Sequence, residues 1–414
     1  MAILYYIVIK IYGLLILISS LFNKKAAQWV SGRKGWKAHL KNTLQPGEKR
    51  IHFHCASLGE FEQGKPVLEA LRKNYPDHKI VLTFFSPSGF ELKKNEPQNI
   101  ESLCDYVFYL PLDGPRNARH FIDLVEPVMS FFVKYEFWHF YIKGFKDRKI
   151  PIYFVSCIFR PNQIFFQKYG QFFDKMLRRV THFFVQNQSS LELLYKNSIP
   201  QVTVTGDTRF DRVFANSLNS KSLPEIKNFK GNKKLFVAGS TWSADEKLLV
   251  AVTQTLTDEF KIIFVPHEIS DRHINSLIQK LGSKTIRYSE WDKKNTSYDF
   301  LIIDNVGMLM SLYKYADVAY VGGGFGKGIH NILEAAVFGI PVFFGPKYKK
   351  FREAIELVHW KGAFSVRHER DFNDKFSDIV TDTVRLEKIK EINLRYIDNN
   401  KGATDLIINY LKMN

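Results

Sequence analysis

The residues IHFHCASLGEFEQGKPVLEALRKNY (51–75) place a short apolar run directly before a turn and a helical pattern. The run 51–55 is β-branched and aromatic and lacks clean polar alternation, which is typical of a strand buried on both faces of a parallel sheet. Apolar residues at helical spacing follow it, with a proline near the start of the pattern. The stretch therefore predicts one strand–helix unit of an α/β fold.

The same alternation of apolar run and helical pattern continues along the chain. Further strands are expected at 79–85, 106–110, 128–132, 152–156 and 182–186, and then at 235–240, 261–267, 300–304, 318–324 and 341–345. This order predicts α/β architecture with parallel sheets. Because 414 residues exceed one ordinary hydrophobic core, we expect two Rossmann-like, doubly wound domains facing a cleft, at 50–206 and 233–385.

Two regions complete this organisation. The polar region 207–232 is expected to contain the interdomain linker, and 386–414 continues a helical pattern to the end of the chain. Open α/β sheets bind ligands outside the carboxyl ends of their strands. Functional residues are therefore expected directly after the predicted strands.

The composition is that of a globular protein with excess positive charge. Apolar residues make up 45% and charged residues 24%, which argues against disorder, a collagen-like repeat and a polytopic membrane protein. The formal net charge is +17, and residues 1–50 alone hold nine Lys/Arg against one acid. Such an excess favours an anionic partner, whether nucleic acid, phospholipid or a phosphorylated substrate. The three cysteines match no zinc or disulfide spacing, which favours buried thiols in a reducing compartment.

The N-terminal residues MAILYYIVIKIYGLLILISSLF (1–22) are almost continuously apolar and are broken by Lys10. A helix of this length measures roughly 33 Å, enough for the hydrocarbon core of a bilayer. The basic segment 23–49 follows the apolar run instead of preceding it, unlike a secretory signal, and places the rest of the chain in the cytoplasm. We expect a membrane-anchor helix next to an anionic leaflet, either spanning the bilayer or lying in its interface.

Two carboxylates stand where catalysis is expected. Glu60 follows the first strand at the start of a helix and could act as a general base, although it could equally complement the helix dipole, as could Glu62. Glu136 follows the strand 128–132 among aromatic residues, where an unpaired carboxylate is costly. Either a functional site or a structural ion pair would explain a carboxylate at position 136. Arg160 follows the strand 152–156 and suits a carboxylate or phosphate.

The C-terminal half offers two strand-to-helix turns. The residues AGSTWSADE (238–246) fit a helix cap and a phosphate contact through Ser240 and Thr241. In VGGGFGKGIHNILEAAVFGIPVFFGP (321–346), glycines permit close backbone approach and a helix starting near His330 would aim N–H groups at an anion. The spacing of these glycines does not fit a dinucleotide-binding fingerprint, and packing alone is the alternative explanation.

Metal and nucleic-acid chemistry have little support in the sequence. There is no Asp-x-Asp pair and no Cys/His ligand spacing, and His52 and His54 on one strand are expected as packed or surface histidines. The run KYKK (347–350) is short and typical of a solvated face. We therefore expect neither a metal nor a nucleic-acid partner.

Taken together, several motifs resemble a known family. They are HCASLGE (54–60), KYEFW (134–138), GDTRFD (206–211), AGSTWSADE (238–246), VPHE (265–268), IIDNVGML (302–309), YKYADVAYVGGGF (313–325) and IHNILEAAVFGIPVFFGP (329–346). In order and spacing they resemble the 3-deoxy-D-manno-octulosonic acid (Kdo) transferases of lipopolysaccharide assembly. The resemblance extends from the N-terminal anchor to about residue 366.

The resemblance implies a GT-B glycosyltransferase on the cytoplasmic side of the inner membrane that transfers Kdo from CMP-Kdo to a tetraacylated lipid A precursor. The family inverts configuration and needs no metal or other cofactor. Glu60 would be the general base and Glu136 a second essential carboxylate, and the residues after 386 would be terminal helices that cross back to the N-terminal acceptor domain. The implied CMP-Kdo contacts are Ser240, Thr241, His267, Gly307, Met308, Leu309, Gly324, His330, Asn331 and Glu334. Contacts to acceptor or Kdo anions are expected from Ser57, Arg160 and Arg209.

The chain departs from the family pattern at several positions. Tyr135 replaces a threonine, Met308 an acidic residue and Ile332 a proline, while Asp207 and Arg209 replace asparagine and lysine. The residues alone leave two alternatives open. One is another GT-B glycosyltransferase or a sugar-nucleotide epimerase, and the other is a non-catalytic membrane protein that binds a sugar nucleotide or an anionic lipid.

Overall fold

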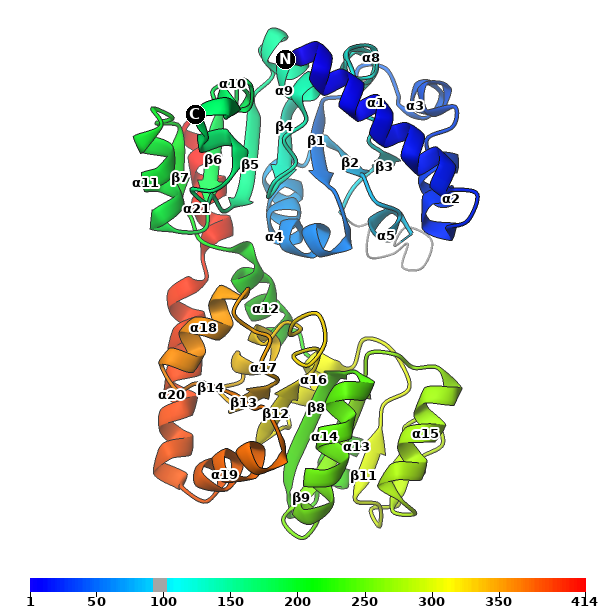
Figure 1. Ribbon diagram of the computed structural model, residues 1–414, viewed down its shortest axis with the longest axis vertical. Coiled ribbons are helices and arrows are strands. Elements are labelled where there is room, and N and C mark those ends of the chain that lie inside the picture. Colours follow the sequence, from blue (N-terminus) through cyan, green and yellow to red (C-terminus); the bar gives the residue numbers. More distant parts are fainter. Residues whose placement is uncertain (92–102) are drawn as a thin grey trace. The chain divides into compact units, whose positions relative to one another are not determined.

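The computed structural model describes residues 1–91 and 103–414, which form two compact units (Figure 1). The first unit comprises Met1–Arg212 and Lys401–Asn414, and the second comprises Val213–Asn400. The boundary lies within the helix α12 (Thr208–Leu218), so the polar region 207–232 contains α12 and α13 (Pro224–Lys230).

The first unit contains a seven-stranded parallel sheet in the order β3-β2-β1-β4-β5-β6-β7. The strands are β1 (Arg50–Cys55), β2 (Lys79–Phe84), β3 (Tyr106–Tyr109), β4 (Pro127–Val133), β5 (Ile152–Cys157), β6 (His182–Val185) and β7 (Val202–Val204). Their central residues are buried on both faces. This explains why the strands have apolar sequences without polar alternation.

Helices cover both faces of this sheet. One face packs against α4 (Leu58–Asn74) and α21 (Ala403–Met413). The other packs against α3 (Trp36–Thr43), α8 (Pro115–Val125), α9 (His139–Asp147), α10 (Gln171–Leu177) and α11 (Gln188–Lys196). The single turn α5 (Pro87–Phe90) and the 3₁₀ turns at Ile164–Phe166 and Lys168–Gly170 connect other elements.

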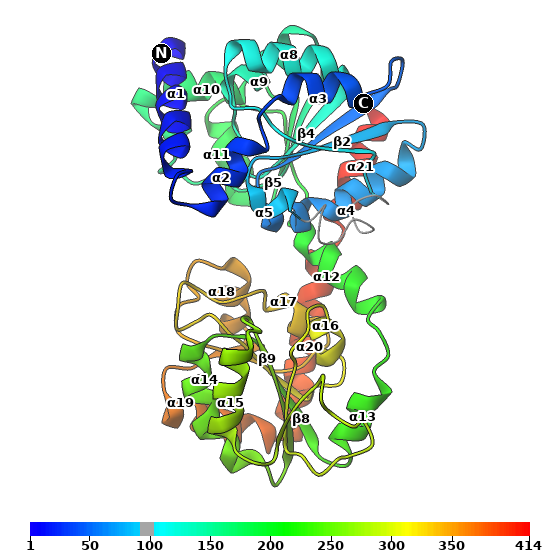
Figure 2. The same cartoon turned by 90° about the vertical axis from the view of Figure 1, so that its right-hand side faces the viewer.

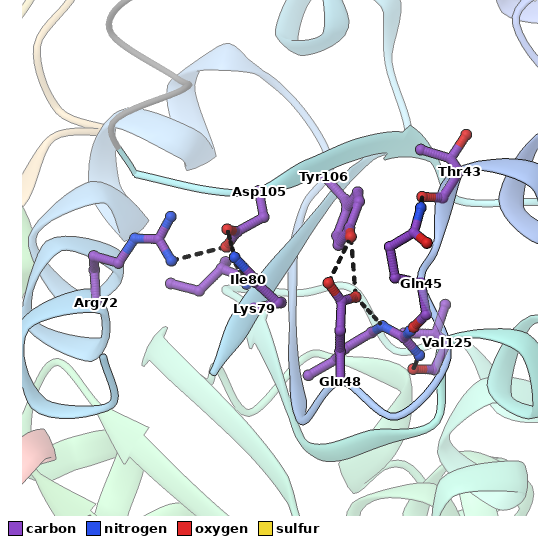
Figure 3. A network of polar contacts seen from close by, with 10 residues as sticks. Thr43, Gln45, Glu48, Arg72, Lys79, Ile80, Asp105, Tyr106 and Val125 are labelled. Atoms are coloured by element: carbon purple, nitrogen blue, oxygen red, sulfur yellow. Dashed lines mark hydrogen bonds and ion pairs between the residues drawn. The ribbon is translucent and has the colours of Figure 1, made fainter. Parts of the chain in front are cut away.

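Polar contacts join the amino ends of the first three strands (Figure 3). Glu48 accepts a hydrogen bond from the Tyr106 hydroxyl at 2.9 Å, and Asp105 accepts one from Arg72 of α4 at 2.8 Å and one from Lys79 at 3.0 Å. Tyr106 and Lys79 are the first residues of β3 and β2. These contacts stabilise the amino-terminal edge of the sheet and leave the carboxyl edge for other side chains.

The second unit contains another seven-stranded parallel sheet, in the order β10-β11-β9-β8-β12-β13-β14. Its strands are β8 (Lys234–Thr241), β9 (Phe260–Pro266), β10 (Thr285–Arg287), β11 (Phe300–Ile302), β12 (Val318–Val321), β13 (Val342–Phe344) and β14 (Ala363–Ser365). The helices α14 (Ser243–Thr253), α15 (Asp271–Leu281), α19 (Glu369–Val380) and α20 (Thr383–Asn400) share one apolar core with the sheet. The shorter helices are α16 (Leu309–Tyr313), α17 (Leu333–Ala336) and α18 (Arg352–His359).

The predicted α/β class with two parallel sheets is confirmed, and every predicted strand is present. The structure adds β7, β10 and β14, each of three residues and each at an edge of its sheet. Such short edge strands carry too few apolar residues to stand out in a sequence.

The apolar N-terminus forms the helix α1 (Ala2–Ser19), followed by α2 (Lys24–Ser31). By length and composition, α1 could cross a membrane. One side of α1 lies against the rest of the first unit (Figure 2). There the Tyr5 hydroxyl donates to Asp113 at 2.8 Å, and the Tyr5 ring lies 5.7 Å from that of Phe172 in α10. Most of the exposed residues of α1 are apolar, and Lys10 is exposed among them.

Candidate active site

Glu60 lies in the first turn of α4, directly after β1. Its Oε2 accepts hydrogen bonds from the backbone N–H groups of Ala56 at 2.5 Å and Ser57 at 3.2 Å. Ser57 is the N-cap of the helix, and the two residues form a capping box. The capping box orients the Glu60 side chain through Oε2, and Oε1 takes no part in these two hydrogen bonds.

Glu136 lies in the turn that follows β4. The indole Nε1 of Trp138 donates to its Oε2 at 2.9 Å. The imidazole Nε2 of His54, in β1, lies 3.6 Å from the same oxygen. The Glu136 side chain is only 15% exposed, so this carboxylate is held in a largely apolar pocket with one direct donor.

The two carboxylates influence each other. Burial raises the pKa of Glu60 to about 7, and the negative charge of Glu136 adds to the effect. Burial also raises the pKa of Glu136 to about 7, against the opposing hydrogen bond from Trp138. Because interacting carboxylates titrate as a pair, the pair has its apparent pKa values near neutral pH. Such a pKa suits a group that must accept a proton at physiological pH.

Positive φ angles occur at the carboxyl ends of β4 and β5. Lys134, which follows β4, has φ of +61°, and Ser156, in β5, has φ of +54°. Positive φ is uncommon outside glycine and concentrates at functional sites. The charge of Lys134 lowers the pKa of Glu60, although burial outweighs it. Lys134 therefore supplies positive potential beside the carboxylate pair.

The two arginines predicted as anion contacts differ in their surroundings. Arg209 forms an ion pair with buried Asp207 at 2.8 Å, and Asp207 also accepts a hydrogen bond from Gln63 at 2.6 Å. Arg160 is exposed, and it opposes the rise that burial causes in the pKa of the neighbouring Tyr135 hydroxyl. Arg160 is thus the more accessible of the two to a ligand.

Aromatic contacts connect α1 to Glu136. The ring of Tyr12 in α1 stacks on Phe85 with centroids 6.3 Å apart, and Phe85 stacks on Trp138 at 4.9 Å. Trp138 in turn donates to Glu136. The apolar helix and the carboxylate are therefore parts of one packed structure within the first unit.

In the second unit, Asp245 joins the loops after β8 and β12. This buried carboxylate accepts hydrogen bonds from Trp242 N at 3.0 Å, the Tyr320 hydroxyl at 2.9 Å and Gly323 N at 2.8 Å. A Cβ atom at Gly322 would lie 2.2 Å from the carbonyl oxygen of Ser240. The first glycines of the run therefore allow the two loops to pack backbone against backbone.

Trp242, His267 and His330 form an aromatic platform at this edge. Trp242 Nε1 donates to His330 Nε2 at 2.9 Å, and the two rings are inclined by only 11°. Because the hydrogen bond joins their edges, the rings lie side by side in nearly one plane. His267 stacks on both, with centroid distances of 4.4 Å and 4.7 Å. Trp242 is 42% exposed, so part of this flat surface is open to solvent.

The other residues predicted for the nucleotide lie at the ends of strands of the second sheet or after them. Ser240 has φ of +52°, and the buried Thr241 hydroxyl donates to Glu246 at 3.0 Å. Gly307 has φ of +95° and precedes Met308, the N-cap of α16, which begins at Leu309. A Cβ at Gly324 would lie 2.6 Å from the Gly345 backbone.

The turn at His330 differs from the helix start that the sequence predicts. The helix α17 has only four residues, and Asn331 Oδ1 already accepts from Leu333 N at 3.2 Å. Asn331 Nδ2 donates to Glu334 Oε1 at 3.1 Å. The backbone N–H of Leu333, at the helix start expected to face an anion, therefore already donates to the Asn331 side chain.

Sequence reasoning missed His54, Trp138, Trp242 and Asp245 as site residues. Each lies inside a motif that was singled out, but its role depends on a partner supplied by another strand or loop. No periodicity or spacing could have revealed these contacts. Across residues 1–91 and 103–414, no group of three or more His, Cys, Asp or Glu side chains could hold a metal ion.

The matching family model and two similar proteins carry the same description. Residues 31–212 match a family described as 3-Deoxy-D-manno-octulosonic-acid transferase (kdotransferase). The chain is 26% identical to the 3-deoxy-D-manno-octulosonic acid transferase of Aquifex aeolicus over 86% of this chain and 94% of that protein. It is also 26% identical to the enzyme of the same name from Haemophilus influenzae, over 90% and 88% of the two chains.

Solved structures show a similar fold. The crystal structure of UDP-GlcNAc 2-epimerase from Neisseria meningitidis bound to UDP-GlcNAc matches with a TM-score of 0.62 at 16% identity. The match covers 88% of this chain and all of that one.

Proposed function

We propose that this chain, which belongs to the 3-deoxy-D-manno-octulosonic acid (Kdo) transferase family of GT-B glycosyltransferases, transfers Kdo from CMP-Kdo to a lipid A precursor in lipopolysaccharide biosynthesis. The observation that carries the proposal is the pair of partly buried carboxylates, Glu60 and Glu136, at neighbouring strand ends, where burial raises the pKa of each to about 7. A transferase that activates a sugar hydroxyl needs such a group.

Glu60 acts as the general base. The acceptor hydroxyl oxygen attacks the anomeric carbon of Kdo and forms the new glycosidic bond, while its proton passes to Glu60. The bond from that carbon to the phosphate oxygen breaks, and CMP leaves with the electron pair. Attack from the side opposite CMP inverts the configuration. The capping box supports this role, because backbone N–H groups hold Oε2 and leave Oε1 for the proton.

Glu136 is the second essential carboxylate. Its negative charge raises the pKa of Glu60, which makes Glu60 a stronger base near neutral pH. Lys134 and the exposed Arg160 supply positive charge for the carboxylate of Kdo or the phosphates of the acceptor.

The second unit binds CMP-Kdo. The aromatic platform of Trp242 and His330 offers a flat surface on which the cytosine ring stacks. Ser240 at the end of β8 and Gly307 in the loop after β11 lie at the carboxyl edge of the same sheet, and Glu334 lies in α17. Such edges are where open α/β sheets bind ligands.

The chain works at the cytoplasmic face of the inner membrane. The exposed apolar side of α1 and the exposed lysines Lys24, Lys25, Lys34 and Lys37 favour an anionic bilayer. Contacts from Tyr5 and Tyr12 hold the other side of α1 against the first unit, which favours a helix lying in the interface. The contacts from Tyr12 through Phe85 to Trp138 bring this membrane helix close to Glu136, where a lipid acceptor arrives.

The test is incubation of the protein with CMP-Kdo and a tetraacylated disaccharide bisphosphate lipid, followed by mass spectrometry. We expect products heavier by one or more Kdo residues, together with free CMP. Consumption of a UDP-sugar with no product from CMP-Kdo would contradict the proposal.

A further inference from the structure

A string of buried polar side chains crosses the first sheet beneath Glu136. His52 and His54 point to the same side of β1, and they are joined by Thr83 of β2 and Ser130 of β4; all four are 0% exposed. The surrounding side chains on this side are aromatic, including Phe132. Polar groups in such a place are costly unless they bond to one another.

Three hydrogen bonds of equal length connect the string. Ser130 Oγ lies 2.8 Å from His52 Nδ1, and Thr83 Oγ1 lies 2.8 Å from both His52 Nε2 and His54 Nδ1. The last nitrogen of the string, His54 Nε2, has no hydrogen-bond partner among the described residues. It faces Glu136 Oε2 at 3.6 Å. This distance exceeds a hydrogen bond.

Proton counting restricts the direction of these bonds. Burial lowers the pKa of both imidazoles, so each ring is neutral and carries one N–H. Thr83 has one hydroxyl proton and can donate it to only one of the two histidines. If Thr83 donates to His54 Nδ1, the proton of His54 lies on Nε2 and points at Glu136. If His54 instead donates to Thr83, a lone pair on Nε2 faces the carboxylate.

An ionised Glu136 selects the first arrangement, because a lone pair and a carboxylate repel each other. Ser130 then donates to His52 Nδ1, His52 Nε2 donates to Thr83, and Thr83 donates to His54 Nδ1. Each side-chain donor of the string then meets an acceptor, and the hydrogen bond of His54 to the Thr83 backbone is the competing contact. The string ends with a neutral N–H donor aimed at the carboxylate.

We propose that His54 is a positioning residue for Glu136, held by Thr83 in the tautomer whose Nε2–H donates to the ionised carboxylate in the reacting enzyme. Together with the Trp138 indole, this donor orients Glu136 and stabilises its charge. The inference rests on the proposed function, since it gives His54 a task in Kdo transfer. The charge of Glu136 acts in turn on the titratable groups that face it, which are Glu60 of α4, Cys55 of β1, and Tyr5 and Tyr12 of α1. The charge of Arg33 acts on His54.

Two substitutions separate positioning from a purely structural role. In His54→Asn the amide can replace Nδ1 and keep the contact to Thr83, but nothing reaches Glu136. In His54→Gln the longer amide can replace Nε2 and still donate to Glu136. A structural role predicts that Asn is the better substitute, and the positioning role predicts that Gln is.

We expect His54→Asn to lower kcat for Kdo transfer about tenfold to hundredfold, the range for losing a hydrogen bond to a charged group, with KM for CMP-Kdo unchanged. The acidic limb of kcat/KM should move to higher pH, because the ionised Glu136 loses a donor. His54→Gln should recover most of kcat and the original limb. A His54→Asn variant as active as His54→Gln would overturn the inference.

A second measurement does not depend on turnover. Heteronuclear NMR of the histidine ring nitrogens in the intact protein reports which nitrogen carries the proton, and the His54 signals are assigned by their loss in His54→Gln. We expect the Nε2-protonated tautomer at pH 8. The Nδ1-protonated tautomer would refute the positioning role even if the protein transfers Kdo. The expected tautomer in a protein that transfers no Kdo would instead refute the proposed function.

Discussion

Replacing Glu60 with glutamine should stabilise the protein at alkaline pH while greatly slowing transfer. The carbonyl oxygen of the glutamine side chain can still accept the backbone N–H groups of Ala56 and Ser57, so the capping box persists. The substitution removes a buried negative charge beside Glu136. It therefore isolates the cost of ionising Glu60 from its structural role.

The sign and size follow from the pKa of Glu60, which burial and the charge of Glu136 raise from 4.5 to about 7. A raised pKa means that the folded state holds the proton more tightly than the unfolded state. The stability from that protonation is fully present below about pH 4.5 and is lost as pH rises through about 7. One pKa unit corresponds to about 1.4 kcal/mol, so about 3 kcal/mol is the upper bound. Residual hydration and the coupling to Glu136 reduce the expected gain to about 1–2 kcal/mol at pH 8.

The assay is denaturant unfolding of wild type and Glu60→Gln in detergent at pH 5 and pH 8. We expect the variant to be more stable at pH 8 and to lose most of this advantage at pH 5. Glu62→Gln is the matched control, because Glu62 lies in the same helix with a side chain 46% exposed. An advantage of Glu60→Gln that is equal at both pH values, or a loss at pH 8, would show that ionising Glu60 does not cost the folded state this free energy.

Two further predictions concern the second unit and the N-terminal helix. Trp242→Ala should weaken CMP binding about 5- to 150-fold in calorimetry, because a stacked base contributes about 1–3 kcal/mol. Trp360→Ala, at another exposed tryptophan of the same unit, should bind CMP as wild type does. If Trp242→Ala and wild type bound CMP with equal affinity, the platform would be excluded as the cytosine site. Replacing the exposed Ile7 and Leu14 of α1 with aspartate should abolish flotation with anionic vesicles, while Val384→Asp, at an exposed position of α20, should leave it intact. Undiminished flotation of the α1 variant would exclude α1 as the membrane contact.

The fold was predictable from the sequence because its main strands are buried on both faces. Runs such as 261–267 and 318–324 have no other simple explanation in a chain with this alternation of helices. The edge strands β7, β10 and β14 were missed, since three residues are too few to show a hydrophobic periodicity. The region 207–232 was expected to contain the interdomain linker because it is polar, and the boundary between the two units lies in it. The helices α12 and α13, each with one buried side, also form there.

The candidate site was predictable only in part. Glu60 and Glu136 were found because a carboxylate directly after a strand is conspicuous, and both have strongly raised pKa values in the structure. His54 was expected as a packed or surface histidine, and it is indeed buried. Its relation to Glu136 depends on the pairing of β1 with β2 and β4, which a one-dimensional pattern does not contain.

The assignment of Glu60 as the base for Kdo transfer can be tested by single-turnover kinetics of Glu60→Gln beside Glu62→Gln, with CMP-Kdo and the lipid acceptor. We expect Glu60→Gln to bind CMP-Kdo as wild type does and to transfer Kdo about 10²–10⁴-fold more slowly, while Glu62→Gln keeps the wild-type rate. Transfer by Glu60→Gln at the wild-type rate would exclude Glu60 as the base.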